Sequence, residues 1–389
     1  MASLERMAVD ERAFSFADAL REALSGGRDF VGNITPVCHA WSTDAFVEHM
    51  LQVHAQLIDP RPVLFSAPPV GSPAAGHVSV ALREGPIAVL RAAAKRRRAS
   101  STPSHAAAGA TRGAGTGGGG GDDVAAPLRA HWPQLELDDP PLTPEDYLAF
   151  FVAPQRAPPN VIDDRIAKVI DGGAGSDEAR AYRTPAAYRI LNMLARPGLC
   201  GADEIPDSSD LVLSPPNAVT RFHIDSGFLG ICDLVAGEKL WAVCSLHDGL
   251  RLGLASGRPM PPLAVDAFLA APSAALVRLR EGQILLVPEG FWHFVVTERP
   301  SLAFSSNALT VAGLRVSEEC VGTRQGRTAC QLVDDPDSLA ALQATHRRAL
   351  ERHLRSAAGL RAALAAAGAS EPLQDQYVAA LERERARRG

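Results

Sequence analysis

The pattern of apolar positions changes twice along the chain. Helical spacing dominates residues 1–30 and recurs after Ser42, where Phe46, Met50, Val53 and Leu57 follow a 3.6-residue period. Between residues 211 and 310, short apolar runs separated by glycine or proline roughly every ten residues are typical of strands. The expected strands are 61–66, 211–213, 231–236, 240–244, 276–279, 284–288, 293–297 and 302–306. A leucine-rich helical pattern returns after Asp335. The pattern predicts an α+β protein with an all-β barrel or sandwich flanked by N- and C-terminal helices.

A low-complexity segment interrupts this pattern at residues 95–126. It begins with the basic run Lys95–Arg98 and ends in five consecutive glycines. Such a segment cannot bury enough apolar surface to offset its chain entropy. The sequence therefore predicts four parts: a flanking segment at 1–94, a disordered linker at 95–126, the main domain at 127–334 and a helical segment at 335–389.

Composition and charge narrow the function classes. Hydrophobic residues make up 46% and charged residues 21% of the 389 positions, as in globular proteins, and the net charge is −5. This charge gives no overall positive field for nucleic acid or an anionic membrane, and no apolar run is long enough to span a bilayer. The six cysteines form no CxxC pair, which favours reduced thiols inside the cell. Lys95–Arg98 is a weak nuclear signal, so nucleus and cytoplasm both stay open.

The segment 220–225, TRFHID, holds a candidate metal site. On a strand, residues two apart point to the same face, so His223 and Asp225 project together. A third ligand is available at His293, at the start of a later expected strand. Two histidines and one carboxylate form the facial triad that binds non-haem Fe(II) and leaves positions open for a co-substrate and O2.

Lysine is rare in this sequence. Only three of the 39 basic residues are lysines, and one of them, Lys239, lies beside Trp241 on an expected inward strand position. A buried ammonium is unfavourable unless it is paired, and the far carboxylate of a small dicarboxylate ligand is a suitable partner. Thr220 offers a hydroxyl to the same carboxylate.

Three blocks, TRFHID (220–225), GEKLW (237–241) and GQILLVPEGFWHFV (282–295), together resemble the JmjC-type 2-oxoglutarate- and Fe(II)-dependent oxygenases of the cupin superfamily. The resemblance covers residues 205–315 and implies a double-stranded β-helix (cupin or jelly-roll) core. It implies Fe(II) ligands at His223, Asp225 and His293, and 2-oxoglutarate contacts at Thr220, Lys239 and Asn307. The upstream tyrosine that often completes such a site is not identified; Tyr182 and Tyr188 are candidates. Dimers through C-terminal helices are frequent in this family.

The resemblance implies a dioxygenase that hydroxylates or N-demethylates a protein or small-molecule substrate, consumes O2 and releases succinate and CO2. The absence of a histone-reading module argues against a histone demethylase. Two alternatives stay open. One is a non-catalytic cupin-fold binding module, and the other is a metal-dependent cupin enzyme that does not use 2-oxoglutarate and has no need of Lys239.

Overall fold

The computed structural model describes part of the chain: residues 11–37, 43–54, 60–65, 161–163, 193, 210–225, 228–256, 258–323, 326–327, 336–355, 357–366 and 368–388. The predicted linker at 95–126, its basic run, and the candidates Tyr182 and Tyr188 lie outside these residues. The predicted division into four parts therefore stays a prediction.

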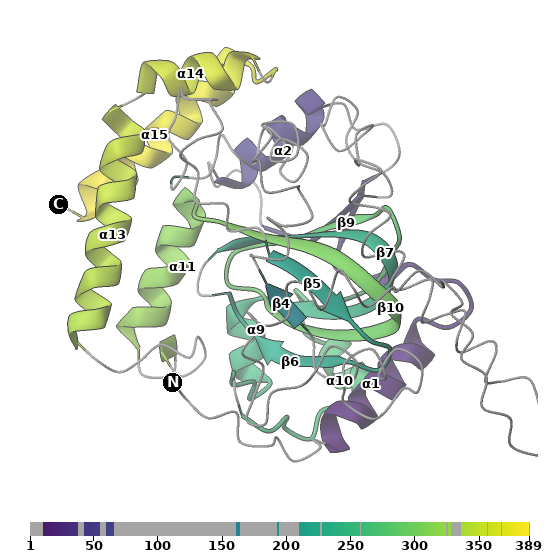
Figure 1. Cartoon of the computed structure of the whole chain (residues 1–389). Coiled ribbons are helices and arrows are strands. Elements are labelled where there is room, and N and C mark those ends of the chain that lie inside the picture. Colours follow the sequence, from purple (N-terminus) through teal and green to yellow (C-terminus); the bar gives the residue numbers. More distant parts are fainter. Residues whose placement is uncertain are drawn as a thin grey trace, which may run out of the picture.

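Two long antiparallel strands, β7 (Leu229–Cys244) and β10 (Trp292–Ala308), form the spine of the sheet (Figure 1). Their first and second halves have different outer neighbours. The remaining strands are β1 (Phe30–Gly32), β2 (Thr35–Val37), β3 (Val63–Phe65), β4 (Val161–Asp163), β5 (Asp210–Ser214), β6 (Val219–His223), β8 (Ala275–Arg280) and β9 (Ile284–Val287). One half-sheet has the order β2-β3-β9-β7-β10-β5-β4, and the other has the order β1-β8-β7-β10-β6. All pairs except β2–β3 are antiparallel.

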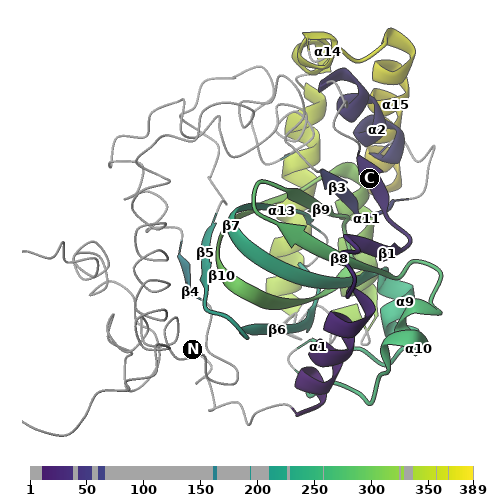
Figure 2. The same ribbon diagram turned by 90° about the vertical axis from the view of Figure 1, so that its right-hand side faces the viewer.

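The two half-sheets curl toward each other where β7 and β10 bend (Figure 2). Gly237 has φ +95°, and a Cβ there would lie 2.3 Å from the carbonyl oxygen of Pro300. Only glycine adopts this backbone without strain and allows such a close approach. The register of β10 against β7 shifts between Thr297 and Ala303, at the same place. The sequence predicted separate strands here, at 231–236 and 240–244 and at 293–297 and 302–306. The structure joins each pair into one bent strand, because the pairing of β7 with β10 resumes after the shifts in register.

The curled sheet encloses one apolar cluster and carries another on each outer side. Inside the curl, residues such as Trp241, Val277 and Leu285 pack together. On one outer side, α1 (Glu11–Ala23) places Phe16 against Phe222 and Phe294, at ring-centroid distances of 5.6 and 5.2 Å. The short helices α9 (Leu246–Arg251) and α10 (Val265–Leu269) complete this side. The structure is therefore a mixed α+β fold around a curled antiparallel half-barrel, compatible with a jelly-roll core.

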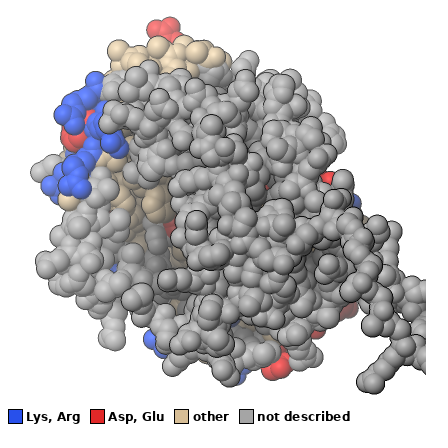
Figure 3. All heavy atoms as spheres, in the orientation of Figure 1, with Lys and Arg blue, Asp and Glu red and all other residues tan. Residues whose placement is uncertain are grey.

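Helices cover the opposite outer side. They are α2 (Thr43–His54), α11 (Val311–Gly322), α13 (Pro336–Arg355), α14 (Ala357–Ala366) and α15 (Glu371–Arg388). Their apolar residues share a cluster with Leu229, Ile231 and Leu286 of the sheet. The helical patterns predicted near residues 46–57 and after Asp335 are confirmed at α2, α13 and α14. Lys and Arg side chains gather on the outer face near α13 and α15 (Figure 3). No helix in the described residues is long and apolar enough to cross a membrane.

A buried carboxylate joins α15 to α11. Glu384 is 0% exposed and accepts hydrogen bonds from Arg315 of α11 (3.0 Å) and from Arg387 and Arg388 of its own helix (2.6 and 2.7 Å). These hydrogen bonds lower the pKa of Glu384 to about 2, although burial acts in the opposite direction. The ionised carboxylate therefore stabilises the packing of the C-terminal helix.

We expect Glu384→Gln to lower the free energy of unfolding by about 3 kcal/mol at pH 7. A carboxyl whose folded pKa lies below its unfolded value stabilises the fold above the unfolded value, near 4.5. That contribution decreases as the pH falls toward 2. Urea unfolding at pH 7, 5, 4 and 3 should show a difference between wild type and variant that shrinks below pH 4.5. A difference that does not depend on pH would contradict the assignment.

Candidate metal centre

His223, Asp225 and His293 meet at one end of the half-barrel. His223 ends β6, Asp225 follows two residues later, and His293 lies opposite His223 in the antiparallel pair of β6 and β10. The imidazole Nε2 atoms of His223 and His293 each lie 3.7 Å from a carboxylate oxygen of Asp225. One ligand atom from each residue lies within 4.8 Å of the other two. The structure thus brings the predicted triad together.

The backbone fixes which nitrogen of each histidine faces the centre. The Nδ1 atom of His223 is 2.9 Å from the carbonyl oxygen of Arg221, and that of His293 is 3.2 Å from the carbonyl oxygen of Phe291. A carbonyl oxygen only accepts, so Nδ1 donates in both rings, and in the neutral form of each ring the lone pair is then on Nε2. Burial, and then the neighbouring His223, lower the pKa of His293 well below its ordinary value. His293 therefore presents a neutral imidazole to this centre.

The three residues fit a metal ion. Ligand atoms bound about 2.1 Å from one ion lie roughly 3–3.5 Å apart, so only small inward movements are needed. The side chains of His223 and Asp225 are each 31% exposed, while that of His293 is 7% exposed. Two neutral imidazoles and one carboxylate on one side, with the other side more open, match the donor set of the 2-His-1-carboxylate sites.

A β-bulge brings Thr220 to the same face as the triad. Residues three apart on a regular strand point to opposite faces. In the pairing of β6 with β10, however, His223 is opposite His293 and Thr220 is opposite Val295, so β6 contains one extra residue. Val295 belongs to the cluster inside the curl. Thr220 therefore lies on the interior face together with His223.

Lys239 lies on the same interior face as His293. In the β7–β10 ladder, Val295 pairs with Trp241 and Thr297 pairs with Lys239, two and four residues after His293, so these pairs share its face. Lys239 is 4% exposed, and its Nζ atom donates to Ser214 Oγ at 2.8 Å and to Thr297 Oγ1 at 3.4 Å. Ser214 belongs to β5 of the other half-sheet. Lys239 therefore points inward, as the sequence predicted, and its ammonium contacts two hydroxyl groups that were not predicted from the sequence.

No carboxylate within the described residues lies within ion-pair distance of Lys239. The thiol of Cys232 is close enough to influence Lys239 electrostatically. Burial raises the pKa of this thiol to about 12, so the thiol is uncharged at neutral pH. Burial lowers the pKa of Lys239 to about 8, which leaves the side chain mostly protonated at neutral pH. Among the described residues, two hydroxyl groups solvate this buried positive charge, and no carboxylate forms an ion pair with it.

Asn307, next to the last residue of β10, lies near the triad. It pairs with Gly230 of β7. A Cβ built at Gly230 would lie 3.7 Å from Asn307 Oδ1 and 3.7 Å from Asp225 Oδ2. Asn307 and Asp225 therefore border the same point of the β7 backbone. The contact of Asn307 with the co-substrate, which the resemblance implies, stays a prediction.

Both tryptophans near the site are part of the apolar core. Trp241 is 8% exposed, and its ring centroid is 5.8 Å from that of His293. Trp292 is fully buried, and its indole N–H donates to the carbonyl oxygen of Leu246 at 3.3 Å. A Cβ at Gly249 of α9 would lie within 2.2 Å of Trp292 Nε1, so the indole packs directly on the helix backbone. These contacts hold the segment next to His293 rigidly.

No family model matches the chain, and no curated protein matches it either. The structure is therefore the evidence for the fold and for the His-Asp-His group.

Proposed function

We propose that this protein is a JmjC-like dioxygenase that uses Fe(II) and 2-oxoglutarate, with a double-stranded β-helix core. Its fold supports this proposal, since a curled antiparallel half-barrel carries a His-Asp-His group at one end. The donor set supports Fe(II) as the ion. The bound Fe(II) would supply the activation of O2, coupled to conversion of 2-oxoglutarate to succinate and CO2 and to hydroxylation of a substrate C–H bond.

The observation that carries the proposal is the buried ammonium of Lys239, which has no ion-pair partner among the residues that the structure describes. A structural lysine would be expected at the surface or beside a carboxylate. Instead, Lys239 is buried on the face that holds His293, with Ser214 and Thr297 as hydroxyl neighbours. The far carboxylate of a dicarboxylate co-substrate would supply the missing negative charge. A metal-dependent cupin enzyme that uses no keto acid, or a module that binds metal only for structure, gives no reason to bury this charge.

The chain's own residues have three tasks in this reaction. Lys239, with Thr220 and the two hydroxyl neighbours, binds and orients the far carboxylate. Asn307, next to Asp225, donates to or accepts from groups at the metal end. The apolar wall of Trp241, Val277 and the residues around them excludes water, which strengthens the charge pair and protects the reacting centre.

The substrate is a protein or a small molecule, and the product is hydroxylated. If the oxidised carbon is an N-methyl group, the hydroxylated product loses formaldehyde and leaves a demethylated amine.

An anaerobic titration tests the proposal directly. Protein loaded with Fe(II) is titrated with 2-oxoglutarate, and the metal-to-ligand absorption band of the chelate is followed. We expect a saturable band with one equivalent of co-substrate, and succinate release after air is admitted. Succinate, which has no keto group, is the matched control and should give no band. Binding of Fe(II) without any band would refute the co-substrate assignment while leaving the metal site intact.

A further inference from the structure

The two ends of β10 meet through a buried hydrogen bond. Glu289 precedes this strand by three residues and Thr310 follows it by two, yet the Thr310 hydroxyl donates to Glu289 Oε1. Glu289 is 5% exposed and Thr310 is 0% exposed. His293 lies near the start of β10 and Asn307 near its end. The hydrogen bond therefore links the two ends of the strand that places both residues at the metal centre.

Thr310 connects the bond to a helix. It is the N-cap of α11, and its Oγ1 accepts from the backbone N–H of Gly313 at 3.1 Å. The hydroxyl has one proton, which is donated to the carboxylate of Glu289, and a lone pair, which caps the helix. The positive N-terminal end of α11 also favours the negative charge of Glu289. The turn before β10 is thereby anchored to α11.

The same turn contacts α11 at a second point. Gly290 has φ +72°, and a Cβ there would lie 2.5 Å from Val316 Cγ1. One residue later, Phe291 donates its backbone N–H to Pro288 at 3.2 Å, and its carbonyl oxygen accepts from His293 Nδ1. A continuous path of contacts thus runs from Thr310 through Glu289 and the turn to the imidazole ring of His293.

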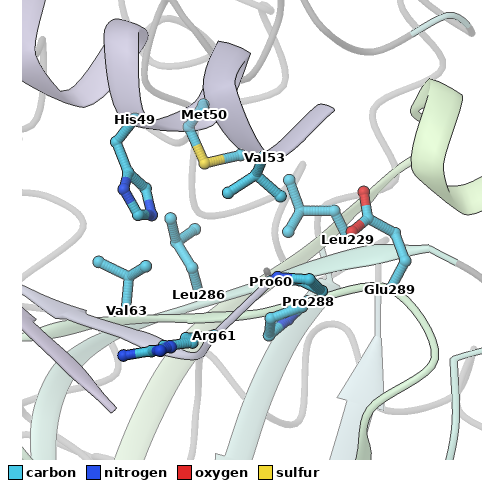
Figure 4. A pocket seen from close by; sticks show the side chains of 10 residues that line it. All are labelled: His49, Met50, Val53, Pro60, Arg61, Val63, Leu229, Leu286, Pro288 and Glu289. Atoms are coloured by element: carbon cyan, nitrogen blue, oxygen red, sulfur yellow. The ribbon is translucent and has the colours of Figure 1, made fainter. Parts of the chain in front are cut away.

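Glu289 also borders the region where the helices cover the sheet. It lines a cavity of about 10 Å³, room for about one water, together with residues of α2 and β9 (Figure 4). On the helix side, burial raises the pKa of Tyr377 in α15, and the nearby Glu289 raises it further. The carboxylate therefore lies between the metal-bearing strand and the surrounding helices.

We propose that Glu289 and Thr310 are positioning residues for the metal centre, which hold the ring of His293 in register with His223 and Asp225. This inference rests on the proposed metal site, although it does not require 2-oxoglutarate. The carbonyl oxygen of Phe291 fixes the tautomer and orientation of His293, and the Glu289–Thr310 bond fixes the turn that carries this carbonyl. Outer hydrogen-bond partners of this kind change metal affinity by about 10- to 100-fold.

The test measures Co(II) binding to the metal-free protein, with Co(II) alone as the probe, through its visible absorption bands. We expect Thr310→Val to weaken Co(II) binding by about 10- to 100-fold and to change the shape of the bands. Thr310→Ser, which keeps the hydroxyl, should restore both. Glu289→Leu should weaken Co(II) binding in the same direction as Thr310→Val. The double variant should lose less than the sum of the two losses, because both changes remove the same Glu289–Thr310 hydrogen bond, and Thr310→Val also removes the N-cap hydrogen bond to Gly313.

The control variant is Leu364→Ala in α14. Leu364 is 1% exposed, and α14 packs against α13 and α15, so this change lowers stability without touching the turn. It should keep the wild-type Co(II) affinity and spectrum. If Thr310→Val does not fold, Glu289→Gln, which keeps the shape of the side chain, carries the test with an expected loss of about tenfold.

Four results separate the positioning proposal from the oxygenase proposal. The positioning role would be overturned if Thr310→Val, or Glu289→Gln in its place, bound Co(II) with the affinity and bands of the wild type. An equal loss of affinity in Leu364→Ala would overturn it as well. Both results would leave the oxygenase proposal unaffected. Co(II) binding with the expected losses, but no 2-oxoglutarate band in the wild type, would overturn only the oxygenase. Failure of the wild type to bind Co(II) would overturn both.

Discussion

Asp225→Ala is expected to abolish tight Fe(II) binding and to leave the fold intact. Asp225 carries the one negative charge of the triad and lies 3.7 Å from Nε2 of both histidines. Without it, two neutral imidazoles would have to hold a divalent cation alone. The loss of affinity should exceed the roughly 10- to 100-fold change that follows removal of an outer hydrogen-bond partner. The fold should persist because Asp225 lies beyond the end of β6 with a partly exposed side chain.

The measurement is the iron content of protein reconstituted with Fe(II) under anaerobic conditions and then desalted, alongside the thermal midpoint. Asp266→Ala is the matched control, since it removes an exposed carboxylate of α10 far along the chain from the triad and changes the net charge equally. We expect the control to retain one Fe(II) per chain and Asp225→Ala to retain almost none. Stoichiometric iron in Asp225→Ala would show that the ion is bound elsewhere.

The triad could be predicted from the sequence because it depends on simple rules. The two-residue period of a strand placed His223 and Asp225 on one side, and an ordered set of short strands placed a second histidine at the start of another. The position of Thr220 is different. Its three-residue spacing from His223 contradicts strand alternation, and only the bulge against Val295 resolves the contradiction. The sequence named Thr220 for its hydroxyl and by resemblance, although strand alternation alone would have placed it on the opposite face.

Of the two hydroxyl groups that contact Lys239, one could have been predicted from the sequence and the other could not. Thr297 could have been found, because it lies four residues after His293 on the same strand and therefore on the same face. Ser214 could not, since it comes from the other half-sheet and approaches Lys239 only where the sheet curls. That curl depends on Gly237 and on the register shifts of β10, which are tertiary features. Glu289 was missed for the same reason, because its partner Thr310 lies beyond the far end of the strand.

Lys239→Ala is expected to lower the affinity for 2-oxoglutarate by roughly 30- to 1,000-fold while Fe(II) binding changes little. The variant leaves the far carboxylate of the co-substrate in a dry pocket with hydroxyl groups alone, which costs on the order of 2–5 kcal/mol. Lys239→Arg should also be impaired. Its planar guanidinium needs more room than the compact ammonium that fits between Ser214 and Thr297.

Lys239→Met separates a functional lysine from a structural one. The pKa of Lys239 is lowered to about 8, so the charged form destabilises the fold at neutral pH, and this cost disappears as the pH rises above 8 toward 10.5. A methionine of similar length removes the cost, and the unfolding free energy of the apoprotein at pH 7 should rise by about 1–3 kcal/mol. Affinity for 2-oxoglutarate should fall in the same variant. Stability and co-substrate binding would then change in opposite directions.

Two measurements show whether Lys239 is functional or structural. They are urea unfolding of the apoprotein at pH 7 and the anaerobic absorption titration of the Fe(II)-loaded protein with 2-oxoglutarate. Thr297→Val gives an intermediate case, because it removes the weaker of the two hydroxyl contacts and keeps the ammonium. It should weaken co-substrate binding less than Lys239→Met does. A Lys239→Met protein that binds 2-oxoglutarate as tightly as the wild type would show that the co-substrate carboxylate lies elsewhere. A large loss of stability in that variant would show instead that the buried charge belongs to the fold.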